Sequence, residues 1–252
     1  MTKTMSRPTR WLSATGLGVV AAWTLAACGG GPPELTEISE SAQQSMDEAN
    51  SLTFTMEDPD NLLGEGLSSM EYSGQSNETN FRIAVAMEGA NIEVLVIDES
   101  TAYAKYEFED EEAGSLFGMG EDAAGQWIET PESDLMGVDE VTAQFDEMSN
   151  GVFSLIDNLS EEELEAVEVE ETELDGQQVY KYDVPATGQV ETEVAPGADT
   201  ASFYFSQESN ELLQLDASTE DATAVFTFSD YDSVEPIEAP PEEEIADIDW
   251  EF

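Results

Sequence analysis

Residues that usually carry covalent chemistry are nearly absent from this chain, which has one cysteine, Cys28, and no histidine. Without histidine, Ser-His-Asp and Cys-His catalysis and most zinc sites are excluded. The sequence contains no G-x-S-x-G elbow and no phosphate-binding glycine loop with its lysine. Two carboxylates could hydrolyse a glycosidic bond, but among 58 acidic residues such pairs arise by chance. The sequence therefore predicts a protein that is not an enzyme and uses no cofactor.

Three acidic clusters offer oxygen ligands for a cation: "DPDN" at 58–61, "DYD" at 230–232 and "DID" at 247–249. None of them lies in a twelve-residue loop with a central glycine and a closing glutamate, which a calcium loop of the EF-hand type requires. We interpret these clusters as solvated acids and predict no metal site.

The first 27 residues have the layout of a secretory signal. Residues 1–10 contain three basic residues and no acidic one, and residues 11–27 are uncharged and mostly small or apolar. This apolar stretch is at or below the length that crosses a bilayer comfortably, so we expect it to be cleaved.

Cys28 ends the segment "LAAC" at 25–28, which matches the bacterial lipobox. That motif implies a diacylglycerol thioether on Cys28, cleavage just before it and N-acylation, for example with palmitate. Two or three acyl chains hold a protein at a membrane almost permanently. Residues 28–33 are then a flexible tether, and the chain is expected outside the cytoplasm, at the outer face of the cell membrane. The alternative is an ordinary cleaved signal followed by an accidental cysteine.

The charge of the chain after residue 27 is extreme. Its 58 acidic residues outnumber its three basic residues, Arg82, Lys105 and Lys181, by 55. Such a surface cannot bind nucleic acid and is repelled by anionic lipid head groups. Because salt screens self-repulsion, this composition also predicts an organism or habitat with high salt.

Hydrophobic periodicity predicts an α+β fold with about nine or ten strands in antiparallel meanders. An amphipathic helix is expected at 34–50 and a second helical region at 138–159, with a mobile acidic loop at 109–125 between them. We expect residues 34–236 to form one domain, and residues 237–252, which are acidic and rich in proline, to form a frayed tail.

The order of these parts resembles the actinobacterial LppX/LprG lipoproteins and their LolA-like relatives over about residues 34–240. The most telling pieces are "VIDESTAYAK" at 96–105 and "FSDYDSVEPIEAP" at 228–240. The resemblance implies a strongly curved antiparallel sheet, a half-barrel wrapped around helices, with an apolar cavity for acylated lipids. This sequence departs from the family because it is extremely acidic and has few basic residues that could bind anionic head groups.

The resemblance and the alternation together predict a protein that binds or carries lipid acyl chains at the cell envelope. The candidate cavity residues are Phe81, Ile83, Val85, Met87, Ile92, Val94, Val96, Phe153, Ile156 and Leu159. Spacing alone does not distinguish an open cavity from a core filled by these same side chains. The alternative function is a ligand-free anchored module that contacts another envelope protein in an interaction or sensory role.

Overall fold

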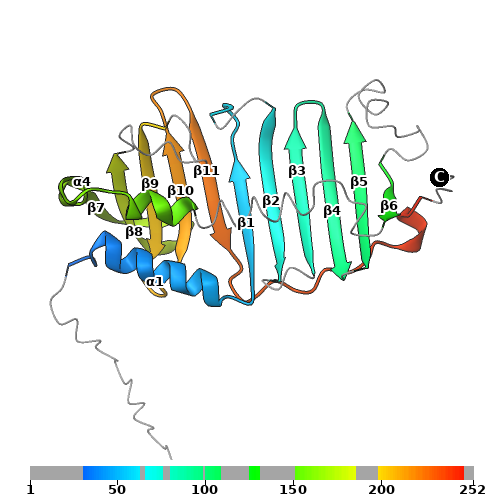
Figure 1. The fold of residues 1–252 in the computed structure, drawn as a ribbon, viewed down its shortest axis with the longest axis horizontal. Helices are drawn as coiled ribbons and strands as arrows, with labels where there is room; N and C mark the ends of the chain where they lie inside the picture. Colours follow the sequence, from blue (N-terminus) through cyan, green and yellow to red (C-terminus); the bar gives the residue numbers. More distant parts are fainter. Residues whose placement is uncertain are drawn as a thin grey trace, which may run out of the picture. The chain divides into compact units, whose positions relative to one another are not determined.

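One antiparallel sheet of eleven strands dominates the described part of the protein (Figure 1). The computed structural model describes residues 31–62, 66–75, 80–98, 100–108, 125–130, 151–185 and 198–246. Residues Pro32–Phe252 form a compact unit of their own, distinct from Met1–Gly31. Within the described ranges, no helix is both long enough and apolar enough to cross a bilayer.

The sheet consists of two meanders that meet in its middle. Strands β1 to β6 pair in sequence order, and so do strands β7 to β11. The first meander comprises β1 (Ser51–Glu57), β2 (Leu67–Gln75), β3 (Phe81–Met87), β4 (Ala90–Asp98), β5 (Thr101–Phe108) and β6 (Trp127–Thr130). The second comprises β7 (Glu168–Leu174), β8 (Gln177–Pro185), β9 (Thr200–Ser206), β10 (Leu212–Ser218) and β11 (Thr223–Ser229).

Antiparallel pairing of β1 with β11 joins the two meanders, with Phe54 opposite Phe228 and Met56 opposite Phe226. The edges of the sheet are therefore β6 and β7, and the sheet is curved but open. The antiparallel sheet confirms the coarse fold class, and it has one or two strands more than the periodicity predicts.

Tight turns set the register of several strand pairs. Gly89, with a φ of 79°, lies in the turn between β3 and β4. Asp175 and Gly176 turn β7 into β8 with φ angles of 49° and 87°. Positive φ angles at both central residues are typical of the hairpin turns whose twist matches that of the flanking strands.

The first helix, α1 (Leu35–Glu48), confirms the predicted amphipathic stripe. Leu35, Ile38, Ala42 and Met46 are buried in the main core, and the helix packs on β10. Residues 151–157 are also helical, which agrees with the end of the second predicted helical region. The rest of that region, 138–150, lies outside the described residues, as does nearly all of the predicted loop at 109–125.

A short helix, α4 (Glu161–Ala166), stands where the alternation from residue 164 predicts the beginning of a strand. That prediction is wrong for residues 164–166, because a capping box at Ser160 and Glu163 starts a helix there. The Ser160 hydroxyl accepts a bond from the Glu163 backbone N–H, and the Glu163 carboxylate accepts one from the Ser160 backbone N–H. The strand itself begins at Glu168.

Residues 237–246 do not form the frayed tail that their composition suggests. The Ile237 N–H donates to the Asn80 side-chain oxygen at 2.7 Å, and the Asn80 side-chain nitrogen donates to the Ile237 carbonyl at 3.0 Å. Further along, a short 3-10 helix, η2 (Glu242–Glu244), leads to Ile245, which forms a parallel bridge with Trp127 of β6. We call residues 234–246 the C-terminal strap.

The strap covers a second, smaller hydrophobic cluster. Leu95, Tyr103 and Trp127 are buried there, with Ile237 and Ile245 packed against them. These strand residues alternate with those of the main core, so the strap lies on the opposite face of the sheet. Two isoleucines, together with the hydrogen bonds to Asn80, therefore dock a segment that is otherwise acidic and rich in proline.

The two edges of the sheet differ. Ile245 of the strap bridges to β6, whereas no segment pairs with the outer side of β7 among the residues that the structure describes. Strand β7 carries four glutamates, Glu168, Glu170, Glu171 and Glu173, all exposed, and Val169 is 41% exposed.

Candidate functional site

One face of the sheet is apolar across ten strands, and we call it the inner face. The register aligns one residue from each of these strands in a single row. From β7 to β5 the row consists of Val169, Tyr182, Phe203, Leu215, Phe226, Met56, Met70, Val85, Ile92 and Tyr106. Because side chains alternate along a strand, the residues between them point to the outer face.

The structure places the predicted cavity residues either on the inner face or in the core that packs against it. Phe81, Ile83, Val94 and Val96 of β3 and β4 belong to the main core. Phe153, Ile156 and Leu159 belong to the same core, and Val85 and Ile92 are partly buried against it. The alternation of β3 places Met87 on this face too, where it is half-buried.

Burial on the inner face falls off along β3, β4 and β5. Phe81 is 1% exposed and Val96 is fully buried, whereas most side chains on the same face towards the other end of these strands are only half-buried. Ala90, at the start of β4, is the exception there and is buried. We call the half-buried group the open end: Val85, Met87, Ile92, Tyr106 and Phe108. The Tyr106 and Phe108 rings stack there with centroids 6.4 Å apart, and burial raises the pKa of the Tyr106 hydroxyl. An apolar surface that grades from buried to half-exposed can accept a further apolar group at its exposed end.

A second apolar hollow, of about 400 Å³, lies where the chain enters the folded unit. Its apolar lining comes from α1 and the two prolines before it, from α4 and the residue after it, and from β7 and β8: Pro32, Pro33, Leu35, Leu164, Val167, Val169 and Tyr182. The Tyr182 hydroxyl donates to the Pro33 carbonyl at 2.7 Å, and burial raises its pKa to about 12. Sequence reasoning missed this hollow, although the alternating Val167 and Val169 were a signal for it.

Beyond the part that the C-terminal strap covers, the outer face of β2 to β5 carries a bridged ion pair. Arg82 on β3 binds Glu71 on β2, and its Nε donates to Glu93 on β4 at 2.6 Å. Burial lowers the pKa of the Arg82 guanidinium, but the bonds and charges of Glu93 and Glu71 outweigh it, so the pKa is raised. Lys105 on β5 pairs with Glu107 at 2.9 Å, and that bond raises the pKa of the Lys105 ammonium.

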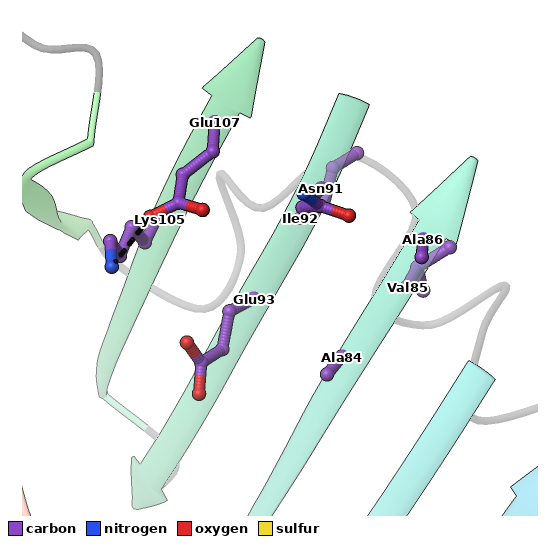
Figure 2. Close-up of a pocket in the computed structure, with 8 residues that line it drawn as sticks. All are labelled: Ala84, Val85, Ala86, Asn91, Ile92, Glu93, Lys105 and Glu107. Atoms are coloured by element: carbon purple, nitrogen blue, oxygen red, sulfur yellow. Dashed lines mark ion pairs between the residues drawn. The ribbon is translucent and has the colours of Figure 1, made fainter. Parts of the chain in front are cut away.

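Figure 2 shows a small pocket whose lining comes mostly from this outer face, although Val85 and Ile92 of the inner-face row also line it. It has a volume of about 160 Å³, below the roughly 300–1,000 Å³ of ligand pockets. Its lining comes from β3, β4 and β5: Ala84, Val85, Ala86, Asn91, Ile92, Glu93, Lys105 and Glu107. The Lys105–Glu107 ion pair lies at its side, so the pocket is a shallow gap between charged side chains.

The third basic residue, Lys181, lies on the outer face of the other meander. Its Nζ lies 2.8 Å from the Asp183 carboxylate and 5.9 Å from the centroid of the Tyr204 ring. Burial alone would raise the pKa of Asp183, but hydrogen bonds from Lys181 and Ser202 lower it. Where the structure describes the chain, no three acidic or cysteine side chains gather as metal ligands. Cys28 and the signal-like residues before it lie outside the described ranges.

Comparison with solved structures shows what this fold resembles. The sequence matches no family model and no curated protein. The crystal structure of LprF from Mycobacterium bovis aligns over 84% of this chain and 99% of its own, with a TM-score of 0.52 and 12% identity. That of the lipoprotein LppX from Mycobacterium tuberculosis aligns over 82% and 99%, with a TM-score of 0.45 and 16% identity. The resemblance expected from the sequence is confirmed for the fold.

Proposed function

We propose that this protein is a bacterial lipoprotein, anchored through Cys28 at the outer face of the cell membrane, that binds or carries lipid acyl chains on its inner face. The observation that carries this proposal is the apolar row across ten strands, whose side chains become half-exposed at the open end. Such a face can shield an alkyl chain from water without any reactive group.

Burial of the lipid's acyl chain supplies the binding energy. Each methylene removed from water contributes about 0.8 kcal/mol, so an acyl chain that covers the open end binds without a polar contact. The fold that this chain shares with LprF supports an open sheet as the scaffold. A fold does not determine a function, so the proposal depends on the inner face itself.

A second candidate is an anchored module without a ligand that contacts another envelope protein. The end of the inner face opposite the open end favours this second candidate. Phe81, Val96 and Ala102 there are already fully or almost fully buried by the protein's own atoms. In that case the residues of the open end would be the margin of a filled core.

Lipid content separates the two candidates. We expect protein purified with Cys28→Ser, which removes the anchoring thiol, to carry lipid at about one molecule per chain in native mass spectrometry. Val85→Gln on the inner face should reduce that lipid, because it puts an unpaired amide where the alkyl chain lies. Ala86→Gln, on the next residue and the opposite face, is the matched control and should leave it unchanged. Lipid-free protein from every preparation would refute the carrier and favour the module.

The lipid anchor is tested separately, in growing cells. Parent protein should incorporate labelled palmitate and stay with the membrane fraction, whereas Cys28→Ser should do neither. Unlabelled parent protein that is released into the medium would refute the anchor.

A further inference from the structure

Strand β7 lies at one edge of the sheet, and its register with β8 shows which of its backbone groups point outwards (Figure 1). The Gln207 N–H donates to the Gln178 carbonyl at 3.0 Å, so the backbone groups of Gln178 point towards β9. Because these directions alternate along an antiparallel strand, the backbone groups of Gln177 point towards β7. Its partner on β7 is Leu174, whose backbone groups therefore point back towards β8.

The same alternation along β7 leaves Val169, Glu171 and Glu173 with backbone N–H and carbonyl groups that point away from the sheet. Among the described residues, no strand lies beyond β7 to pair with them. Each of the three offers one donor and one acceptor to a strand that arrives there. Their side chains lie on the inner face, since Val169 stands opposite Tyr182.

The apolar hollow lies beside this edge, on the same face. Val169 and Tyr182 line it together with Leu164 and Val167. Its volume of about 400 Å³ falls within the range of roughly 300–1,000 Å³ that ligand pockets have. Side chains directly opposite each other in antiparallel strands have Cβ atoms about 4.5–5.5 Å apart. An apolar side chain placed opposite Val169 therefore stands beside the hollow.

The charges along this edge are negative. All four glutamates of β7 are exposed, and two more glutamates line the hollow. Lys181 is the single cation in β7 to β11, and it already binds the Asp183 carboxylate on the outer face at 2.8 Å. An added strand that carries lysine or arginine opposite the glutamates is attracted, whereas one that carries aspartate or glutamate is repelled.

We infer that the β7 edge docks an extended, basic segment of another protein, which adds to the sheet as a further strand and places an apolar side chain beside the hollow. Backbone hydrogen bonds to Val169, Glu171 and Glu173 supply affinity, and the charges supply specificity. The inference does not depend on a lipid ligand, because none of these contacts involves one.

The seven-residue peptide VKTKKIK tests this inference. In antiparallel register it places a lysine opposite each glutamate of β7 and the isoleucine opposite Val169. Binding of the rhodamine-labelled peptide to the full chain carrying Cys28→Ser is measured by fluorescence anisotropy at 0.1 M salt. The peptide VETEEIE, with glutamate in place of every lysine, should bind at least about a hundredfold more weakly, because like charges then face each other. Equal binding of the two would overturn the inference.

Two N-methylated peptides separate strand addition from attraction by charge alone, because both keep every charge. N-methylation of the lysine opposite Glu171 removes an N–H that points at β7 and should weaken binding about tenfold. N-methylation of the next lysine, opposite Glu170, removes an N–H that points away from β7 and should leave binding within about twofold. If the two modifications had the same effect, the peptide would not add as a strand, and the inference would fail.

Two charge reversals locate the site on the protein. Glu171→Lys should weaken binding of VKTKKIK about tenfold, and a glutamate at the fourth position of the peptide should restore it. Glu220→Lys makes the same change at an exposed position between β10 and β11, away from the edge, and should alter binding by less than about twofold. Equal effects of the two variants would contradict docking at β7.

Amide hydrogen exchange followed by NMR tests the edge itself. In the free protein the N–H groups of Val169, Glu171 and Glu173 should exchange much faster than that of Thr172, which points towards β8. Bound VKTKKIK should slow the first three. Slow exchange of all three in the free protein would show that a segment of this same chain covers the edge, and would overturn the inference.

Discussion

Gly74 gives the sharpest test of the register that builds the inner face. It lies in β2 opposite Phe81 of β3, and a Cβ added there would stand 2.7 Å from the Phe81 Cα and 2.9 Å from the Asn80 carbonyl oxygen. The Phe81 Cβ would be nearer still. These atoms are backbone or fixed to it, so no side-chain rotation relieves the overlap.

The cost of Gly74→Ala follows from that geometry. Ordinary contact begins at 3.4 Å, so the backbone of β3 must move by at least about 0.7 Å. Overpacking a core costs about 1–3 kcal/mol, and the upper end applies because backbone must shift. The lower entropy of the unfolded alanine chain offsets about 0.4–1 kcal/mol. We therefore expect a loss of about 2 kcal/mol in the free energy of unfolding, or roughly 4–8 °C in Tm.

Urea denaturation followed by tryptophan fluorescence measures this loss. Gly31→Ala is the matched control, because no atom lies within 4 Å of the added Cβ and its φ is not positive. It should stay within about 0.5 kcal/mol of the parent protein. If Gly74→Ala were equally neutral, Gly74 would not face Phe81, and the rows that define the inner face would be misaligned.

Two further predictions concern charge and protonation. The Tm should rise steeply between 0.1 and 2 M NaCl, because the excess of 55 negative charges after residue 27 repels itself at low ionic strength. A flat salt profile in differential scanning calorimetry would contradict the predicted adaptation to high salt. The free energy of unfolding should also fall as pH rises from about 10 to about 12. Burial, and to a smaller extent the charge of Tyr180, raises the pKa of Tyr182 to about 12. In this pH range the native state therefore keeps a proton that the unfolded state has lost. Tyr182→Phe should make that part of the urea midpoint profile shallower, and an unchanged slope would show that Tyr182 does not contribute to it.

Much of the sheet could be predicted from the sequence because the period of its strands is local. Residues 51–57, 67–75 and 90–98 are strands with the bounds that their alternation suggests. The pairing of β1 with β11 could not be predicted, since Phe54 and Phe228 lie far apart in the sequence and no local pattern indicates their register. Docking of the C-terminal strap was missed for a related reason. Two isoleucines and one asparagine hold a segment whose composition is typical of a tail.

The inner face was predictable as a set of residues but not as a surface. Alternation places Ile83 and Ile92 on one face, yet Ile83 is buried and Ile92 is only half-buried, a difference that the alternation does not predict. The same limit applies to the cations. Arg82 reaches Glu71 and Glu93 only because β2, β3 and β4 are neighbours in a particular register, which depends on tertiary pairing.

The exposed edge strand β7 affects whether two molecules can associate through the edges of their sheets. An open sheet edge is a template on which another chain can add, and a long sheet is at risk of growing into a polymer. A second β7 arriving there would align glutamates with glutamates, and like charges placed opposite each other in neighbouring strands oppose pairing. At the far side, Ile245 already occupies a position beside β6. The two ends of the sheet thus oppose edge-to-edge growth by different means: electrostatic repulsion at β7, and at β6 a segment of the same chain that already occupies a position beside the strand.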